Sequence, residues 1–245
     1  MIDAHRQPSY RVRMDWGPTG AAAVAAAGGV AVVVDVLSFT TTLSVAMDAG
    51  ITVYPFGWKD ERAEAYAAER DAVLARGRSV RDGVSLSPAT VRAASGVDRL
   101  VLPSPNGSAI SFGLADSGAT VVGASLRNAT AVARSLAATD RPVAVVAAGE
   151  RWPDGTLRPA VEDLWGAGAV LAALVDLGAT GLSPEARMAE AAYRAVADRV
   201  ADELHACASG RELVDAGFAT DVAIAAETDT SDVVPVLRGD AFVAG

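Results

Sequence analysis

The sequence predicts an α/β protein, a three-layer α/β/α structure whose largely parallel central sheet is built from repeated βα units. Two uncharged runs, residues 30–34 and 143–148, are rich in β-branched or small apolar side chains and have the length of strands buried on both faces. Each run leads into a polar loop and then a helix-like segment. With 51% hydrophobic residues among 245, the chain can bury a full core. We expect a single domain over residues 1–245, with a helical C-terminal portion from about residue 183.

The N-terminal part of the chain predicts a first βα unit with flanking elements. Weak alternation at residues 10–16 suggests an edge strand, and Gly17 to Gly20 reads as a turn into an alanine-rich helix. After the strand at 30–34, we expect a helix at 43–49 and a strand at 51–56. An amphipathic helix should follow from residue 60 to about residue 76, with Asp60 as its N-cap, and then a surface loop at 77–89.

The same order of elements returns twice. The second unit comprises a strand at 100–102, a loop at 103–108, a helix to 117 and a strand at 119–123. The third comprises the strand at 143–148, a loop at 149–160, a helix at 161–177 and a possible short strand. We expect glycines at 50, 118 and 178 to end the three helices, because each lies in a similar five-residue segment that begins with Asp and ends with Thr. Either internal duplication or the common need for a glycine cap would explain this similarity.

Polar side chains follow the strand of each unit. If the three strands are parallel neighbours, the loops after them meet at one edge of the sheet, where α/β proteins bind ligands. This arrangement would bring together Asp35, Asn106, Glu150, Glu162 and Asp163. An acid at a strand end suits a cation, and hydroxyls and amides at the start of the next helix suit an anion.

Composition excludes several classes. A net charge of -9 argues against a nucleic-acid partner, which requires a basic face. One cysteine, Cys207, precludes an intramolecular disulfide, and two histidines cannot supply a His-rich zinc site, so we expect a cytoplasmic location. The uncharged run at 20–34 is too short to span a bilayer, and no membrane partner is expected. The alanine-rich helices could form the faces of a homodimer.

Familiar phosphate and nucleophile motifs are absent. There is no Gly-x-Gly-x-x-Gly after a strand, no P-loop, since the only lysine is Lys59, and no Gly-x-Ser-x-Gly. A haloacid-dehalogenase phosphatase would carry a second acid two residues after its strand-end aspartate. That position is Leu37, so this comparison fails on chemistry.

Five ordered blocks resemble the 2-phosphosulfolactate phosphatase family over nearly the whole chain. They are Asp-Val-Leu-Ser-Phe-Thr-Thr-Thr at 35–42, Pro-Asn-Gly-Ser at 105–108, Glu-Asp-Leu-Trp-Gly-Ala-Gly-Ala at 162–169, Ser-Gly-Arg-Glu-Leu at 209–213 and Asp-Val-Val-Pro at 232–235. The resemblance implies a layered α/β/α fold and a magnesium-dependent phosphatase. Its substrate would be phosphosulfolactate, hydrolysed to sulfolactate on the route to coenzyme M. The sequence departs from the family at residues 78–88, where a Gly-Glu-Arg-Gly-Gly-like block is replaced although the Ser-Pro survives, so this loop bears on the exact substrate.

Candidate roles follow from both lines of reasoning. Asp35 is a Mg²⁺ ligand or a nucleophile. Glu162 and Asp163 are a second ligand or a base, with Glu162 taken as the ligand although the sequence does not distinguish the two; the alternative is that they are solvated acids that favour the helix dipole. Groups expected to bind the substrate and its phosphate are Ser38, Thr40, Thr41, Thr42, Asn106, Gly107, Asn128, Arg151 and Arg158.

Two mechanisms and three functions fit these residues. Either an oriented water attacks phosphorus in line, or Asp35 forms a phospho-aspartyl intermediate. A small phosphorylated acid would be the substrate. The alternatives are a protein that binds a phosphorylated or sulfonated acid without turnover, and a metal-dependent enzyme for another anionic substrate.

Overall fold

The computed structural model describes residues 2–57, 62–78, 80 and 83–245. Within them, nine strands form one sheet and two short strands form a separate hairpin. The strands are β1 (Val12–Trp16), β2 (Val30–Val34), β3 (Thr52–Gly57), β4 (Val73–Leu74), β5 (Arg99–Ser104), β6 (Thr120–Ala124), β7 (Val143–Ala147), β10 (Pro235–Arg238) and β11 (Ala241–Ala244), with β8 (Glu150–Arg151) and β9 (Leu157–Arg158) in the hairpin.

Eleven α-helices are found in the described chain, and together with the sheet they confirm the predicted α/β class. They are α1 (Gly17–Val24), α2 (Phe39–Asp48), α3 (Ala63–Glu69), α4 (Pro88–Arg92), α5 (Gly107–Leu114), α6 (Ala129–Ala137), α7 (Val161–Asp176), α8 (Pro184–Arg194), α9 (Val200–Ala206), α10 (Ala208–Asp215) and α11 (Ala219–Ala225). Short 3-10 helices cover Asp3–Arg6, Leu126–Asn128 and Ala197–Arg199.

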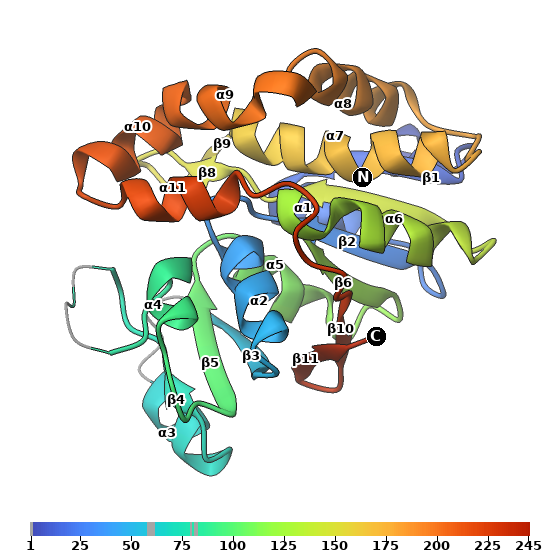
Figure 1. Ribbon diagram of the computed structural model, residues 1–245. Coiled ribbons are helices and arrows are strands. Elements are labelled where there is room, and N and C mark those ends of the chain that lie inside the picture. Colours follow the sequence, from blue (N-terminus) through green and yellow to red (C-terminus); the bar gives the residue numbers. More distant parts are fainter. Residues whose placement is uncertain (1, 58–61, 79, 81–82) are drawn as a thin grey trace.

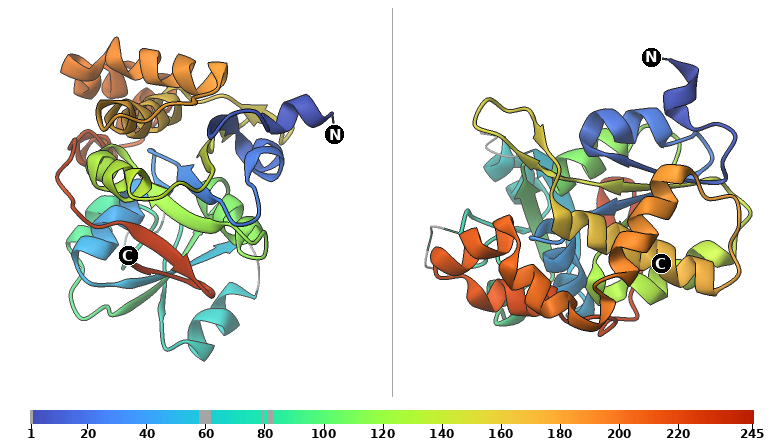
Figure 2. Two further views of the ribbon diagram at one scale, coloured as in Figure 1. Left: turned by 90° about the vertical axis from the view of Figure 1, so that its right-hand side faces the viewer. Right: turned by 90° about the horizontal axis from the view of Figure 1, so that it is seen from above.

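The large sheet consists of two parallel parts joined by an antiparallel hairpin. Its order is β1-β7-β2-β6-β10-β11-β3-β5-β4, with β1 at the edge as expected. The parallel parts are β1-β7-β2-β6 and β3-β5-β4, and the C-terminal hairpin β10-β11 lies between them (Figures 1 and 2). The expectation that the three unit strands are neighbours is right for β2 and β7 and wrong for β5, because β6, β10, β11 and β3 intervene.

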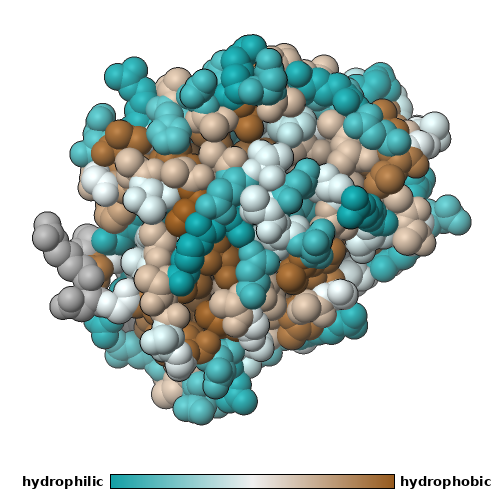
Figure 3. Space-filling model, in the orientation of Figure 1, coloured by the Kyte–Doolittle hydropathy of each residue, from teal (hydrophilic) through white to brown (hydrophobic). Residues whose placement is uncertain are grey.

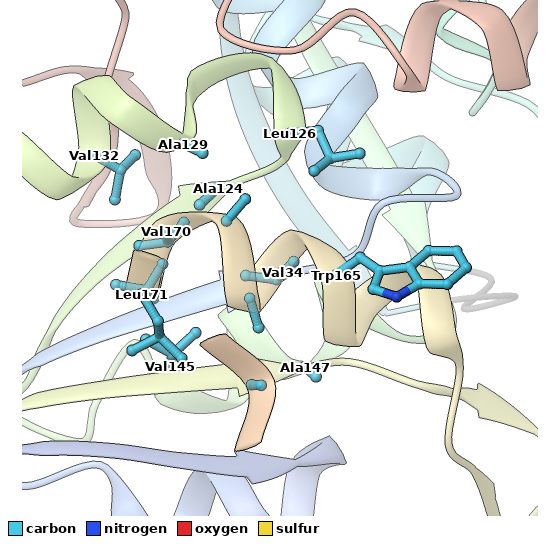
Figure 4. Packing of buried hydrophobic residues seen from close by; sticks show 14 of the residues in the cluster. Val34, Ala124, Leu126, Ala129, Val132, Val145, Ala147, Trp165, Val170 and Leu171 are labelled. Atoms are coloured by element: carbon cyan, nitrogen blue, oxygen red, sulfur yellow. The ribbon is translucent and has the colours of Figure 1, made fainter. Parts of the chain in front are cut away.

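Helices cover both faces, which explains why strand β2 is apolar throughout. Val32 and Val34 face a core shared with α6 and α7, and α8 packs against the outer side of α7 (Figure 1). Ala31 and Val33 face a second core shared with α1, α2 and α5. Figure 4 shows the first of these cores at close range, with the side chains of β2, β6 and β7 lying against those of α6 and α7. The three layers are therefore those that the sequence predicts.

Several element boundaries differ from the expectations. The segment at 17–20 is already helical, and α2 begins at residue 39, so its threonines lie inside the helix. Helix α3 ends at residue 69 because the chain turns into β4, and the loop at 149–160 contains the β8-β9 hairpin. The helical portion expected from about residue 183 consists of four short helices, α8, α9, α10 and α11, with a 3-10 turn between α8 and α9. In place of a strand after residue 178, the described chain has only an isolated bridge between Val12 and Leu182.

The glycine caps at Gly50 and Gly178 are confirmed, because each follows the C-cap residue of its helix with a φ of +77° and +91°, respectively, which a residue with a Cβ adopts only with strain. Gly118 also has a positive φ, +78°, but α5 ends at Leu114, so this glycine lies in the turn before β6 and does not cap the helix. The expected cap Asp60, together with residues 79, 81 and 82 of the divergent loop, lies outside the described residues.

The surface carries both polar and apolar residues. On the face in Figure 3, hydrophilic residues surround separate hydrophobic patches. In the described part of the chain, we find no helix whose length and apolar character would let it cross a lipid bilayer.

Candidate active site

A cavity of about 420 Å³ lies where the loops after β2, β5 and β7 meet. Three segments that are distant in sequence thus form one site, although β5 belongs to the other part of the sheet. The loop before α4 and helix α10 complete the wall. The lining residues are Asp35, Leu37, Ser38, Gly77, Arg78, Leu86, Ser104, Pro105, Asn106, Glu150, Arg151, Arg158, Ser209, Glu212 and Leu213.

Asp35 lies on this wall and is held in place by the start of two helices. Its Oδ1 accepts a hydrogen bond from the Phe39 amide at 3.1 Å, and its Oδ2 accepts one from the Gly107 amide at 2.7 Å. Burial raises the pKa of Asp35, while these two amides and the guanidinium of Arg78 act in the opposite direction. The carboxylate is therefore fixed in orientation and only slightly exposed to solvent.

Gly107 is required at this position by space. A Cβ built on it would lie 2.7 Å from Asp35 Cβ and 2.7 Å from the ring of Phe39. The close approach lets the first turn of α5 deliver its amide to Asp35. The sequence predicted a substrate contact for Gly107, and in the structure its backbone N–H acts on the aspartate.

The hydroxyl cluster after β2 is divided between two roles. Ser38 lines the cavity and accepts a hydrogen bond from Arg78 Nη2. The three threonines are buried and bond to backbone groups: Thr40 to Asp35, Thr41 to Val36 and Thr42 to Leu86. Their hydroxyls hold the loop and α2 in place and do not line the cavity.

Asn106 and Glu150 form a pair on the cavity wall. Asn106 Nδ2 donates to Glu150 Oε2 at 2.9 Å. Burial, and after it the negative charge of Asp35, raises the pKa of Glu150 to about 7. Glu150 was expected among the converging acids but received no role from the sequence, since a lone acid at the start of a hairpin has no distinguishing pattern.

The two adjacent acids at the start of α7 are separated by the structure. Asp163 Oδ1 accepts from the Val36 amide at 2.7 Å and Oδ2 accepts from the Gly149 amide at 2.8 Å, so this carboxylate joins the loops after β2 and β7. Its pKa is raised well above the ordinary value, chiefly by burial and then by Asp35. Glu162 is 2% exposed and lies beside the Cys207 thiol, whose pKa burial raises to about 12. Neither acid lines the cavity.

Three arginines reach the cavity from separate segments. Arg158 Nη2 donates to Ser209 Oγ at 2.9 Å, and Arg151 Nη2 donates to the Pro105 carbonyl at 3.4 Å. Arg78 comes from the divergent loop. Its Nη2 donates a hydrogen bond to Ser38 Oγ, and its positive charge acts to lower the pKa of Asp35. The sequence had predicted Arg151 and Arg158 as substrate contacts and left Arg78 unassigned, although it marked that loop as one that bears on the substrate.

Asn128 lies elsewhere. Its Oδ1 accepts from the Ser125 amide at 2.8 Å and its Nδ2 donates to the Val233 carbonyl at 3.1 Å, as part of a capping box before α6. The amide group is thus used in full by the fold.

The donors on the cavity wall suit a hard divalent cation better than a soft one. Asp35, Glu150 and Asn106 offer oxygen atoms, and Mg²⁺ is bound in proteins through one or two carboxylates with several waters. Among the described residues, no group of three or more His, Cys, Asp or Glu side chains is arranged as a metal cluster. Of the two expected ligands, only Asp35 lies on this wall.

Comparison with known proteins confirms the family that the five sequence blocks resemble. The model of the 2-phosphosulpholactate phosphatase family matches residues 20–240. A probable 2-phosphosulfolactate phosphatase of Deinococcus radiodurans is 33% identical over 224 residues, covering 88% of this chain and 91% of the relative. A protein of the same name from Thermus thermophilus is 33% identical over 218 residues, covering 86% and 88%, and one from Symbiobacterium thermophilum is 31% identical over 244 residues, covering 86% and 91%. The chain therefore belongs to the 2-phosphosulfolactate phosphatase family, whose name denotes a phosphoric monoester hydrolase.

Proposed function

We propose that this protein is a Mg²⁺-dependent phosphatase that hydrolyses the phosphate monoester of 2-phosphosulfolactate to sulfolactate and phosphate, in the cytoplasm and on the route to coenzyme M. One observation carries the proposal: a cavity at the carboxyl ends of the parallel strands combines the carboxylates of Asp35 and Glu150 with three arginines. The relatives with this name extend over nearly the same length of chain.

The charges on the cavity wall support a substrate with several anionic groups. As its name states, 2-phosphosulfolactate carries a phosphate, a sulfonate and a carboxylate. Arg78 and Ser38 would receive the phosphate beside Asp35, and Arg151 and Arg158 on the opposite segment would receive the other two anions. In a protein of net charge -9, the three arginines balance the three acids that line the cavity, Asp35, Glu150 and Glu212, so the wall is less negative than the protein as a whole.

The residues of the chain would divide the work of hydrolysis. Arg78 and the Ser38 hydroxyl neutralise charge that spreads over the phosphoryl oxygens. Asn106 holds the Glu150 carboxyl in place to accept a proton from the attacking water or return one to the leaving oxygen. Asp35, with the side-chain oxygen of Asn106, would hold Mg²⁺, which when bound supplies further positive charge against the phosphate.

The test is phosphate release from phosphosulfolactate, with phospholactate and phosphoglycolate as comparison substrates, with Mg²⁺ and after treatment with EDTA. We expect activity to disappear with EDTA and to return with Mg²⁺, and Asp35→Asn to lose at least about a hundredfold in kcat. Asp71→Asn is the matched control, because its side chain is fully exposed. Release that is unaffected by EDTA or by Asp35→Asn contradicts the metal mechanism, and tight binding of phosphosulfolactate without turnover favours a binding protein.

The same preparation separates the two mechanisms. A phospho-aspartyl intermediate at Asp35 is an acyl phosphate, and borohydride added during turnover reduces it to homoserine, which mass spectrometry of the peptide detects. Direct attack by water on phosphorus forms no acyl phosphate and leaves Asp35 unmodified. The hydrogen bonds to both Asp35 oxygens support attack by water, since they lower the nucleophilicity of the carboxylate.

A further inference from the structure

Helix α11 places one buried carboxylate behind the arginine of the divergent loop. Asp221 is 1% exposed. Its Oδ1 accepts from Ser87 Oγ at 2.5 Å and its Oδ2 accepts from Arg78 Nε at 3.1 Å. Asp221 does not itself line the cavity. A buried carboxylate is costly unless it is paired, so its position calls for a reason.

Arg78 is anchored at both ends of its guanidinium. Nε is bonded to Asp221 and Nη2 donates to Ser38 Oγ, while the side chain remains 19% exposed at the cavity. Asp221 engages only Nε, in contrast to the two parallel bonds of a fork-on-fork pair. Among the described residues, Nη1 has no hydrogen-bond acceptor, so the guanidinium keeps a donor for a ligand.

We propose that Asp221 is a positioning residue, which holds Arg78 so that the outer nitrogens of its guanidinium bind the phosphate group beside Asp35. The proposal rests on the proposed function for the identity of that anion. Helix α11 contributes no group to the cavity, but through Asp221 it would affect how the anion is bound. The same contact holds the first residue of the divergent loop, Arg78, in place.

The charge of Asp221 and its hold on Arg78 have opposite effects on phosphate binding, so the two roles predict opposite changes in affinity when Asp221 is replaced by asparagine. Asp221 is negative, so its removal leaves the anion site more positive, and electrostatics alone would make phosphate bind more tightly to Asp221→Asn. If Asp221 orients Arg78, the variant binds phosphate more weakly because the arginine becomes free to rotate away. The sign of the change therefore distinguishes a positioning residue from a charge that only stabilises the fold.

The experiment is calorimetric titration of inorganic phosphate into the wild type, Asp221→Asn, Arg78→Met and the double variant, all in Mg²⁺ buffer. We expect Kd to rise about tenfold for Asp221→Asn and to be the same for Arg78→Met with and without the second change. An equal or lower Kd in folded Asp221→Asn, or the same tenfold rise in the Arg78→Met background, overturns the proposal. Circular dichroism and the melting temperature establish that each variant is folded.

A second variant covers the case in which Asp221→Asn does not fold. Ser87→Ala removes the other partner of Asp221 and leaves its charge in place. We expect a rise in phosphate Kd of about threefold that is absent in the Arg78→Met background, and an equal rise in both overturns the proposal. Turnover is measured in parallel. A wild type that binds phosphate but hydrolyses no ester refutes the proposed function alone, and a wild type that turns over ester without binding phosphate refutes the positioning role alone.

Discussion

Substitution of Gly107 by alanine tests the geometry of the aspartate directly. The added Cβ would lie 2.7 Å from Asp35 Cβ, against about 3.5 Å for an ordinary carbon contact, so the carboxylate or the start of α5 must move by about 0.8 Å. A misplacement near 1 Å costs about a hundredfold in rate at a positioned group. Overpacking of this kind also lowers the free energy of unfolding by about 1–3 kcal/mol. We therefore expect kcat to fall about a hundredfold in a protein that still folds.

The control for this prediction lies in the same helix. Gly113→Ala is also a glycine-to-alanine change in α5, and no atom lies within 4 Å of the Cβ it adds. Alanine in a helix is favoured over glycine by about 0.5–1 kcal/mol, so this variant should be as active as the wild type and slightly more stable. The measurements are steady-state phosphate release and urea unfolding. If Gly107→Ala keeps full activity, the contact with Asp35 does not position a catalytic group and the reasoning is refuted.

Two further predictions separate residues that build the site from those that act in it. Asp163→Asn should lower the free energy of unfolding by about 1–3 kcal/mol in urea, because an amide can accept from only one of the Val36 and Gly149 N–H groups and turns a donor toward the other. Unfolding midpoints equal to those of the wild type would show that this link is dispensable. Thr41→Val should cost about 1 kcal/mol of stability with activity retained, whereas Ser38→Ala should lose about tenfold in kcat/KM with its melting temperature unchanged. A loss of activity in Thr41→Val, or a loss of stability with full activity in Ser38→Ala, would contradict the assignment of a structural role to Thr41 and a binding role to Ser38.

The parts of the site that follow strand ends were predictable because burial leaves a clear pattern. A run such as 30–34 is apolar on both faces only in a covered parallel strand, so Asp35 had to lie at the ligand-binding edge. Asn106 and Glu150 reach the cavity for the same reason. Their roles remain predictions, since placement in a cavity does not establish catalysis.

Other features of the site could not be predicted, because they depend on the direction in which individual side chains point. Because α2 begins at residue 39, its threonines project from a helix and bond backward to loop carbonyls, which a count of hydroxyls cannot show. Glu162 and Asp163 are neighbours on α7 and therefore point about 100° apart, so only one can reach the two loop amides. Arg78 belongs to an irregular loop, where no period predicts which side chain turns inward.

The C-terminal hairpin has a consequence for the order in which this sheet can be assembled. Its two strands join the sheet through a single register pair on each side, Val236 with Val122 and Phe242 with Val53. During synthesis, both parallel parts leave the ribosome well before residues 235–244 do. The seam between them can close only as a late, long-range event, and until then β6 and β3 expose unpaired edges on which a nascent chain is open to misassociation.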